Sequence, residues 1–178
     1  MFFEHSAMSL RPAYPNPVNE VAARVTAGGV VLLGVVAIAL SVRWLAVVLA
    51  AGFALRVLWG PRFSPLALLA TRVVVPRLGL PPRPVAGPPK RFAQLIGLAF
   101  SGVAALLLFP LGAHLAGYLV LGALVVAAIL ESVFGVCLGC RAFALLMRAG
   151  VVPPEVCERC NDIWAGRTPP AAAAVPRP

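Results

Sequence analysis

The stretch VTAGGVVLLGVVAIAL, residues 25–40, decides the class of fold. It holds no charged side chain and lies within a longer apolar segment that spans residues 21–42. A helix of about 20 apolar residues crosses the roughly 30 Å hydrocarbon core of a bilayer. Its glycines would weaken a helix in water, but in a membrane they let a neighbouring helix approach closely. The segment therefore predicts a transmembrane helix, and Asn19 is a suitable N-cap for it.

The composition of the whole chain indicates several such helices. The chain has 178 residues, of which 61% are hydrophobic and 12% charged, with a mean hydropathy of +0.94. Soluble domains have about 25% charged residues. The formal charge is +9, but the basic residues flank the apolar segments and form no run interleaved with aromatic residues. This pattern indicates contacts with lipid headgroups and argues against a nucleic-acid partner.

Three further apolar segments, 44–59, 92–109 and 111–134, extend the prediction to four spans. Only short turns separate the first from the second and the third from the fourth. The predicted fold class is therefore an all-α integral membrane protein with four transmembrane helices in two tight hairpins. Arg56 lies one turn inside the second span, and we expect it to extend to the headgroups. Gln94 is expected to donate or accept an interhelical hydrogen bond.

Short amphipathic helices are predicted after spans 2 and 4. The first covers residues 66–75, with Ser64 as N-cap and Pro65 at the first helical position. The second covers residues 142–147. Between the halves, residues 80–89 hold five prolines and predict a stiff, extended linker.

The chain divides into four parts. They are a disordered tail at 1–17, a membrane domain at 18–150, a segment with the second cysteine pair at 151–167 and a disordered tail at 168–178. The tight turns carry only Arg43, whereas the central linker and both terminal regions carry nearly all other basic residues. By the positive-inside rule, both termini and the linker are expected on the cytoplasmic side of a multi-pass plasma-membrane protein.

All four cysteines follow the last span. They form two C-x-x-C pairs, CLGC and CERC, which consist of Cys137, Cys140, Cys157 and Cys160. Sixteen residues separate the pairs, a spacing within the range of zinc sites that use four thiolates. Two thiolates three residues apart can bind one ion, and a second pair completes a tetrahedron. The favoured interpretation is one Zn²⁺ held by these four cysteines in a non-enzymatic scaffold or partner-docking protein.

The same thiols also fit a redox function. In a C-x-x-C motif one thiolate attacks and the other thiol resolves the mixed disulfide, and the thiolate is favoured at a helix N-terminus or beside a cation. Glu131 lies less than two turns before Cys137 and is a candidate acceptor for a thiol proton, or else an interfacial carboxylate paired with an arginine. The alternative function is therefore disulfide exchange or sulfur relay with a soluble thioredoxin-like or sulfurtransferase partner. A weak internal repeat motivates a second alternative, a small transporter subunit.

Several stretches together carry a resemblance to a known family. They are NEVAARV at 19–25, GPRFSP at 60–65, PPKRFAQ at 88–94, and the segment from LE at 130–131 to CLGC at 137–140. The chain resembles, over about residues 18–162, a bacterial family of small membrane proteins catalogued as domain of unknown function 4395. The resemblance implies a four-helix inner-membrane protein with the cysteine motif after the last span. It implies no particular activity.

Overall fold

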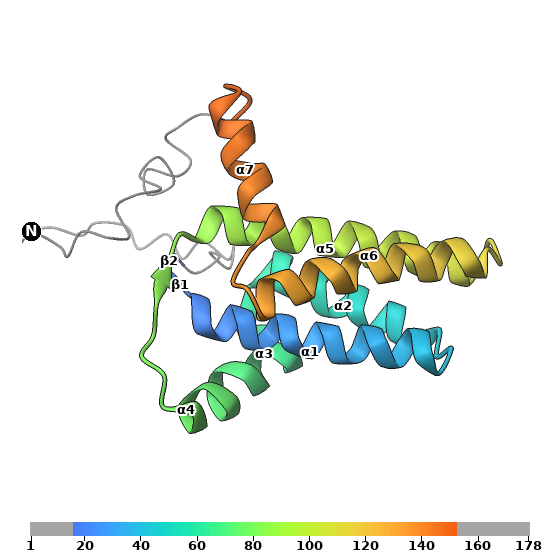
Figure 1. Ribbon diagram of the computed structural model, residues 1–178, viewed down its shortest axis with the longest axis horizontal. Helices are drawn as coiled ribbons and strands as arrows, with labels where there is room; N and C mark the ends of the chain where they lie inside the picture. The colour runs from blue at the N-terminus through green and yellow to red at the C-terminus, as the bar shows by residue number, and fades with distance from the viewer. Residues whose placement is uncertain (1–15, 153–178) are drawn as a thin grey trace, which may run out of the picture.

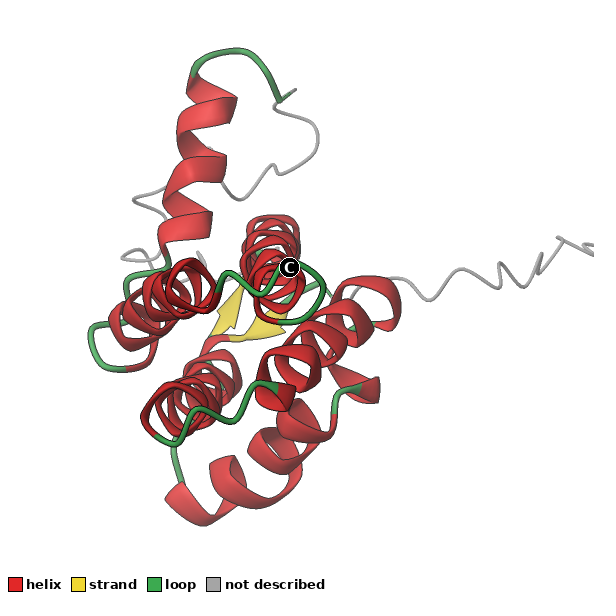
Figure 2. Ribbon diagram, turned by 90° about the vertical axis from the view of Figure 1, so that its right-hand side faces the viewer, coloured by secondary structure: helices red, strands yellow, loops and turns green. Residues whose placement is uncertain are grey.

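Four long helices form an up-and-down bundle. The computed structural model describes residues 16–152, so the predicted tails and the second C-x-x-C pair lie outside the described residues. The bundle helices are α1, α2, α5 and α6, which span Glu20–Ala39, Trp44–Trp59, Gly87–Leu108 and His114–Ser132. They run side by side in Figure 1, and Figure 2 shows them nearly end-on. Among residues 16–152, α1, α5 and α6 are long and apolar enough to cross a membrane, and α2 is shorter at 16 residues.

The first hairpin begins with the predicted cap. Asn19 accepts a hydrogen bond from the backbone nitrogen of Val21 at 3.0 Å, which satisfies one of the free donors of the first turn of α1. The helix ends at Ala39, three residues before the predicted end of the span at 42. Ser41 adopts a left-handed φ of 55° in the turn, and α2 starts at Trp44. The chain therefore reverses within a few residues, as the sequence predicted.

The linker differs from the prediction in two places, at its C-terminal end and near its middle. Helix α5 begins at Gly87, five residues before the predicted start of the span. The N–H groups in the first turn of a helix have no acceptor within the helix, so proline, which lacks an N–H group, fits there. The last two prolines of the predicted linker accordingly lie in the first turn of α5. Upstream, β2 (Pro84–Val85) pairs antiparallel with β1 (Val18–Asn19). This two-stranded ribbon ties the linker to the start of α1 (Figure 1).

The segment after α2 is more broken than the single helix predicted for residues 66–75. It consists of a 3-10 turn at Pro61–Phe63, α3 at Pro65–Leu69, a π-helical turn at Ala70–Val74 and α4 at Val75–Leu78. Ser64 occupies the N-cap position of α3, but its side chain makes no capping hydrogen bond. Its hydroxyl is buried with no hydrogen-bond partner among the described residues. The predicted N-cap position of Ser64 and the place of Pro65 at the start of the helix are therefore confirmed, without a capping bond from the serine side chain.

Two polar side chains within the bundle also differ from expectation. Arg56 is only 4% exposed, so the predicted extension to the headgroups is wrong. Its Nε donates to the carbonyl of Gly52 at 3.0 Å, and its guanidinium lies 4.2 Å from the centre of the Phe53 ring. The side-chain oxygen of Gln94 is buried and has no hydrogen-bond partner in the described part of the chain. Both residues line cavities described below.

Small residues bring the helices together. Gly97 of α5 lies against the ring of Phe53 of α2, and Gly34 of α1 lies against Val125 of α6. The hydroxyl of Ser101, one turn after Gly97, donates to the Gly97 carbonyl at 2.7 Å. Because this hydroxyl is bonded within α5, the small serine side chain lets a neighbouring helix pack closely. The buried core includes Val30, Leu49, Phe53, Ala104, Leu121, Leu124 and Ala128.

The outer surface of the bundle is apolar. Large exposed side chains on the four helices include Leu32, Val48, Leu106, Leu119 and Val126. Water-soluble monomers rarely expose apolar surface on this scale. The exposed apolar surface and the helix lengths are those of a membrane protein.

Candidate dithiol site

The first cysteine pair lies at the junction between α6 and α7, and α7 spans Leu138–Arg148. Gly135 takes a left-handed φ of 68°, a conformation that costs glycine little, and turns the chain away from α6. The side chain of Arg24 binds the freed carbonyls at the end of α6, with an Nη2–O distance of 2.8 Å to Val133. A cation at a helix C-terminus also interacts favourably with the helix dipole. The end of α6 and the start of α7 are thereby fixed to α1.

Cys137 is the N-cap of α7. Its backbone is extended, with φ −86° and ψ 106°, and its Sγ accepts a hydrogen bond from the backbone nitrogen of Cys140 at 3.4 Å. The sulfur therefore faces the free N–H groups and the positive end of the helix dipole. This position stabilises a thiolate over a thiol. Both cysteines are free thiols, Cys137 buried and Cys140 half-buried.

Close packing holds α7 across the start of α5. A Cβ built on Gly139 would lie 2.6 Å from both the Cα and the Cβ of Ala93, so only glycine permits this approach. One turn further along α7, the rings of Phe143 and Phe92 meet at a centroid separation of 5.6 Å. These contacts hold the N-terminus of α7, and with it Cys137, against α5. Figure 1 shows α7 leaving the bundle at a steep angle.

An ion pair lies beside the thiols. Nζ of Lys90, in the first turns of α5, is 2.7 Å from Oε1 of Glu131, near the end of α6. The two side chains are 9% and 17% exposed. The sequence suggested an arginine as the partner of Glu131, which is wrong, because Lys90 occupies that position. Sequence reasoning assigned Lys90 only to topology, and its place at the start of a span gave no signal of a site.

The pKa values of the two thiols are shifted in opposite directions. A hydrogen bond from the Cys140 side chain is the main cause that lowers the pKa of Cys137, and the charge of Lys90 lowers it further. Burial and the negative charge of Glu131 act in the other direction but do not prevail. The same thiol–thiol hydrogen bond, followed by burial, raises the pKa of Cys140 far above its usual range. The pair thus consists of one thiol poised to ionise and one that keeps its proton.

Cys137 faces a cavity despite its burial. An apolar cavity of about 410 Å³ lies between the helices and is lined by Glu131 and Cys137 at one end. Other residues of its wall are Phe53, Arg56, Gln94, Phe100 and Leu124. We call it the apolar cavity. Cys137 is therefore buried at the edge of an internal cavity.

The structure thus brings together three of the five residues that the sequence selected. Cys137, Cys140 and Glu131 meet at one end of the bundle, whereas Cys157 and Cys160 lie outside the described residues. Within residues 16–152 no group of three His, Cys, Asp or Glu side chains is placed to hold a metal ion. The four-cysteine zinc site therefore stays a prediction.

The acidity of Cys137 should respond in opposite directions to its two charged neighbours. We expect its rate of alkylation by iodoacetamide to rise with pH through a midpoint below about 8.5, the usual thiol pKa. Glu131→Gln removes a charge that raises the pKa, so the midpoint should fall. Lys90→Met removes a charge that lowers the pKa, so the midpoint should rise. Peptide mass spectrometry assigns the rates to Cys137, and shifts of the same sign in both variants would contradict the arrangement.

Comparison with known proteins yields one match. The model of a family described as "Domain of unknown function (DUF4395)" matches residues 18–148. No curated protein and no solved structure matches the chain.

Proposed function

The chain belongs to the DUF4395 family, whose description carries no activity, and we propose from the geometry of the site that it is a membrane-bound thiol–disulfide exchange protein. Cys137 is the attacking residue and Cys140 the resolving residue. The observation that carries the proposal is the Cys137 sulfur at the N-cap of α7, 3.4 Å from the backbone nitrogen of Cys140. An attacking thiolate is stabilised by that position.

The neighbouring charges support the same assignment. Lys90 favours the Cys137 thiolate, and Glu131 holds Lys90 in place by the 2.7 Å contact. The charge of Glu131 also acts on Cys140, so we assign its carboxylate as the acceptor of the proton that this resolving thiol must lose.

The exchange proceeds in two balanced steps. The Cys137 thiolate attacks a disulfide of a soluble thioredoxin-like protein, so that a bond forms between Cys137 and one partner sulfur while the partner's own disulfide breaks. The other partner sulfur leaves as a thiolate and takes a proton from water. Cys140 then loses its proton and attacks Cys137, which releases the second partner thiolate. Two electrons pass from the Cys137–Cys140 dithiol to the partner, and a reduced dithiol protein returns them by the reverse route.

The topology we propose places this site on the cytoplasmic side. All four helices α1, α2, α5 and α6 cross the membrane in this arrangement, with α2 as the short span. The end of the bundle that carries the dithiol site also holds the start of α1, the segment from the end of α2 to α4, the linker, the start of α5 and the start of α7 (Figure 1). The basic residues of these segments are Arg24, Arg62, Arg72, Arg77, Arg83, Lys90, Arg91, Arg141 and Arg148. The turn between α1 and α2, at the opposite end, has only Arg43. The positive-inside rule supports a cytoplasmic position for the basic end.

A zinc site is the second candidate, and one observation favours it. The thiols of Cys137 and Cys140 are unbridged and lie within a single turn, which is the form of half a tetrahedral site. Cys157 and Cys160 would supply the other half. In that case the protein would act as a scaffold, and its thiols would not exchange with a disulfide.

Trapping of a mixed disulfide tests the exchange proposal. In Cys140→Ser the first step can proceed but the second cannot, so the variant should accumulate a covalent adduct with an oxidised thioredoxin-like protein. We expect at least about tenfold more adduct than for the wild type or for Cys137→Ser, since the attacking thiolate is lost in the latter. Both variants replace one sulfur by oxygen, so they control for one another. Equal adduct from Cys137→Ser and Cys140→Ser would contradict the assigned roles.

A further inference from the structure

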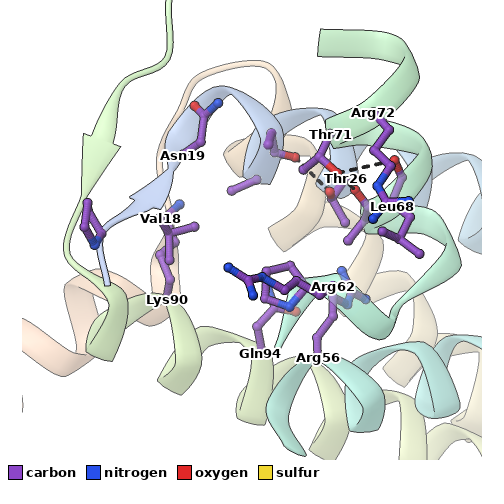
Figure 3. A pocket seen from close by; sticks show the side chains of 15 residues that line it. Val18, Asn19, Thr26, Arg56, Arg62, Leu68, Thr71, Arg72, Lys90 and Gln94 are labelled. Atoms are coloured by element: carbon purple, nitrogen blue, oxygen red, sulfur yellow. Dashed lines mark hydrogen bonds between the residues drawn. The ribbon is translucent and has the colours of Figure 1, made fainter. Parts of the chain in front are cut away.

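A second cavity at the basic end of the bundle has a different character. It lies among α1, α2, α3, the π-helical turn and α5, and has a volume of about 480 Å³. We call it the basic pocket, and its polar wall consists of Asn19, Thr26, Arg56, Arg62, Thr71, Arg72, Lys90 and Gln94. Figure 3 shows these side chains around one hollow, with Lys90 on one side, Arg72 on the opposite side, and Arg56 and Arg62 between them.

The charge of the basic pocket is of one sign. Four cationic side chains line it, and none of the described residues in its wall is acidic. Lys90 is paired with Glu131, which does not line the pocket, and the other three cations of the wall are guanidinium groups. Arg56 is held rigidly, because it is 4% exposed and its guanidinium lies on the Phe53 ring. Arg62 and Arg72 are exposed at the mouth.

Cationic side chains around a small volume repel one another, and an anion between them relieves this repulsion. Guanidinium groups bind phosphate oxygens in pairs through parallel N–H donors. The hydroxyls of Thr26 and Thr71 donate to backbone carbonyls of their own helices, so they have no hydrogen left to donate to an anion. Gln94 is different, because its amide has an unpartnered buried oxygen, and a flipped amide presents its NH₂ group to an anion.

We infer that the basic pocket binds a phosphate-type oxyanion, either free or as the headgroup of an anionic lipid. Its volume of about 480 Å³ exceeds that of a single phosphate and accommodates a headgroup with its glycerol. The arginines at its mouth lie where the helices end, which is the level of headgroups in the proposed topology. The described residues of its wall include no cysteine, so the inference does not depend on the exchange chemistry.

Native mass spectrometry of the full-length protein in neutral detergent provides the test. Phosphatidylglycerol and phosphatidylcholine are added in parallel, and inorganic phosphate is added in a third arm, in which the shift of the unfolding temperature is read. We expect retention of phosphatidylglycerol over phosphatidylcholine if the ligand is a lipid headgroup. A rise in unfolding temperature with millimolar phosphate, and no lipid preference, identifies a free oxyanion.

Paired variants locate the binding. Arg62→Gln/Arg72→Gln removes two exposed arginines of the pocket and should weaken binding roughly tenfold or more, in line with the loss of charge-assisted hydrogen bonds. Arg77→Gln/Arg91→Gln removes the same charge from exposed residues outside the pocket and should leave binding unchanged. Cys137→Ser/Cys140→Ser should also bind as the wild type does. Equal loss in both arginine pairs, or no preference for phosphatidylglycerol and no effect of phosphate, would overturn the inference.

Discussion

Replacement of Gly97 by leucine is expected to lower the free energy of unfolding of the bundle by about 3 kcal/mol, since overpacking of a closed interface forces a backbone shift. A Cβ at Gly97 would lie 2.6 Å from Cζ and 2.7 Å from Cδ1 of the Phe53 ring. The ring is itself fixed, because it lies beneath the guanidinium of Arg56. The contact between α2 and α5 therefore cannot accept a larger side chain without separating the two helices. Unfolding in mixed detergent micelles, followed by loss of helical circular dichroism, measures the effect.

Gly102 of the same helix is the matched control. A Cβ at Gly102 meets no atom within 4 Å, so Gly102→Leu should be neutral or slightly stabilising through its higher helix propensity. Phe53→Ala should lessen the cost of Gly97→Leu by making room for the new side chain. Equal stability of the Gly97→Leu and Gly102→Leu variants would show that α2 and α5 do not pack as described.

The second large effect concerns the Lys90–Glu131 ion pair. Lys90→Met leaves the Glu131 carboxylate in a site where its side chain is 17% exposed, and loss of one partner of a buried pair costs about 3 kcal/mol or more. Glu131→Gln should cost less, because glutamine keeps an acceptor for the lysine ammonium. The double variant Lys90→Met/Glu131→Gln removes both charges and should be more stable than Lys90→Met alone. Detergent unfolding of the three variants gives the coupling energy of the pair.

Strict additivity of the two single effects would contradict a direct pair, because groups in contact couple by about 0.5–3 kcal/mol. The readout is distinct from the alkylation midpoints described above. Stability reports the pair itself, and the midpoints report its field at Cys137. A pair that affected stability but not the acidity of Cys137 would place the charges away from the sulfur.

The sequence predicted the bundle well because its signal is physical and local. An uncharged apolar run such as residues 25–40 must be buried with its backbone hydrogen bonds formed, and a helix in lipid or in a large core meets both requirements. The tryptophans at 44 and 59 also mark the two ends of α2 in the structure. The start of α5 was harder to predict, since proline terminates a helix interior but is favoured in a first turn. Only the surrounding fold decides which role Pro88 and Pro89 take.

The candidate site was predictable in part. The C-x-x-C spacing identified Cys137 and Cys140, and chain proximity identified Glu131. Lys90 was missed because it lies 41 residues from Glu131 along the chain, and only the pairing of α5 with α6 brings the two together. The burial of Arg56 was missed for a similar reason, since one turn from a helix end the sequence does not show whether a neighbouring element covers the side chain.

Lys90 belongs to both sites at the basic end. It contributes charge to the basic pocket and forms an ion pair with Glu131, which lines the apolar cavity together with Cys137. Arg56 and Gln94 line both the basic pocket and the apolar cavity. An anion that draws the Lys90 ammonium toward the pocket would therefore weaken the field that favours the Cys137 thiolate. The two proposals remain separately testable, because one is measured by lipid or phosphate binding and the other by sulfur chemistry.

Cys137 and Cys140 are proposed to exchange disulfides with a partner, and one experiment distinguishes this function from zinc binding. The full-length protein is purified without reductant or chelator, its metal content is determined, and its cysteines are alkylated and mapped by mass spectrometry before and after oxidation by a thioredoxin-like disulfide. The account predicts metal-free protein in which oxidation protects Cys137 and Cys140 together and a dithiol restores both. One zinc ion per chain, with all four cysteines protected until a chelator is added, would contradict it.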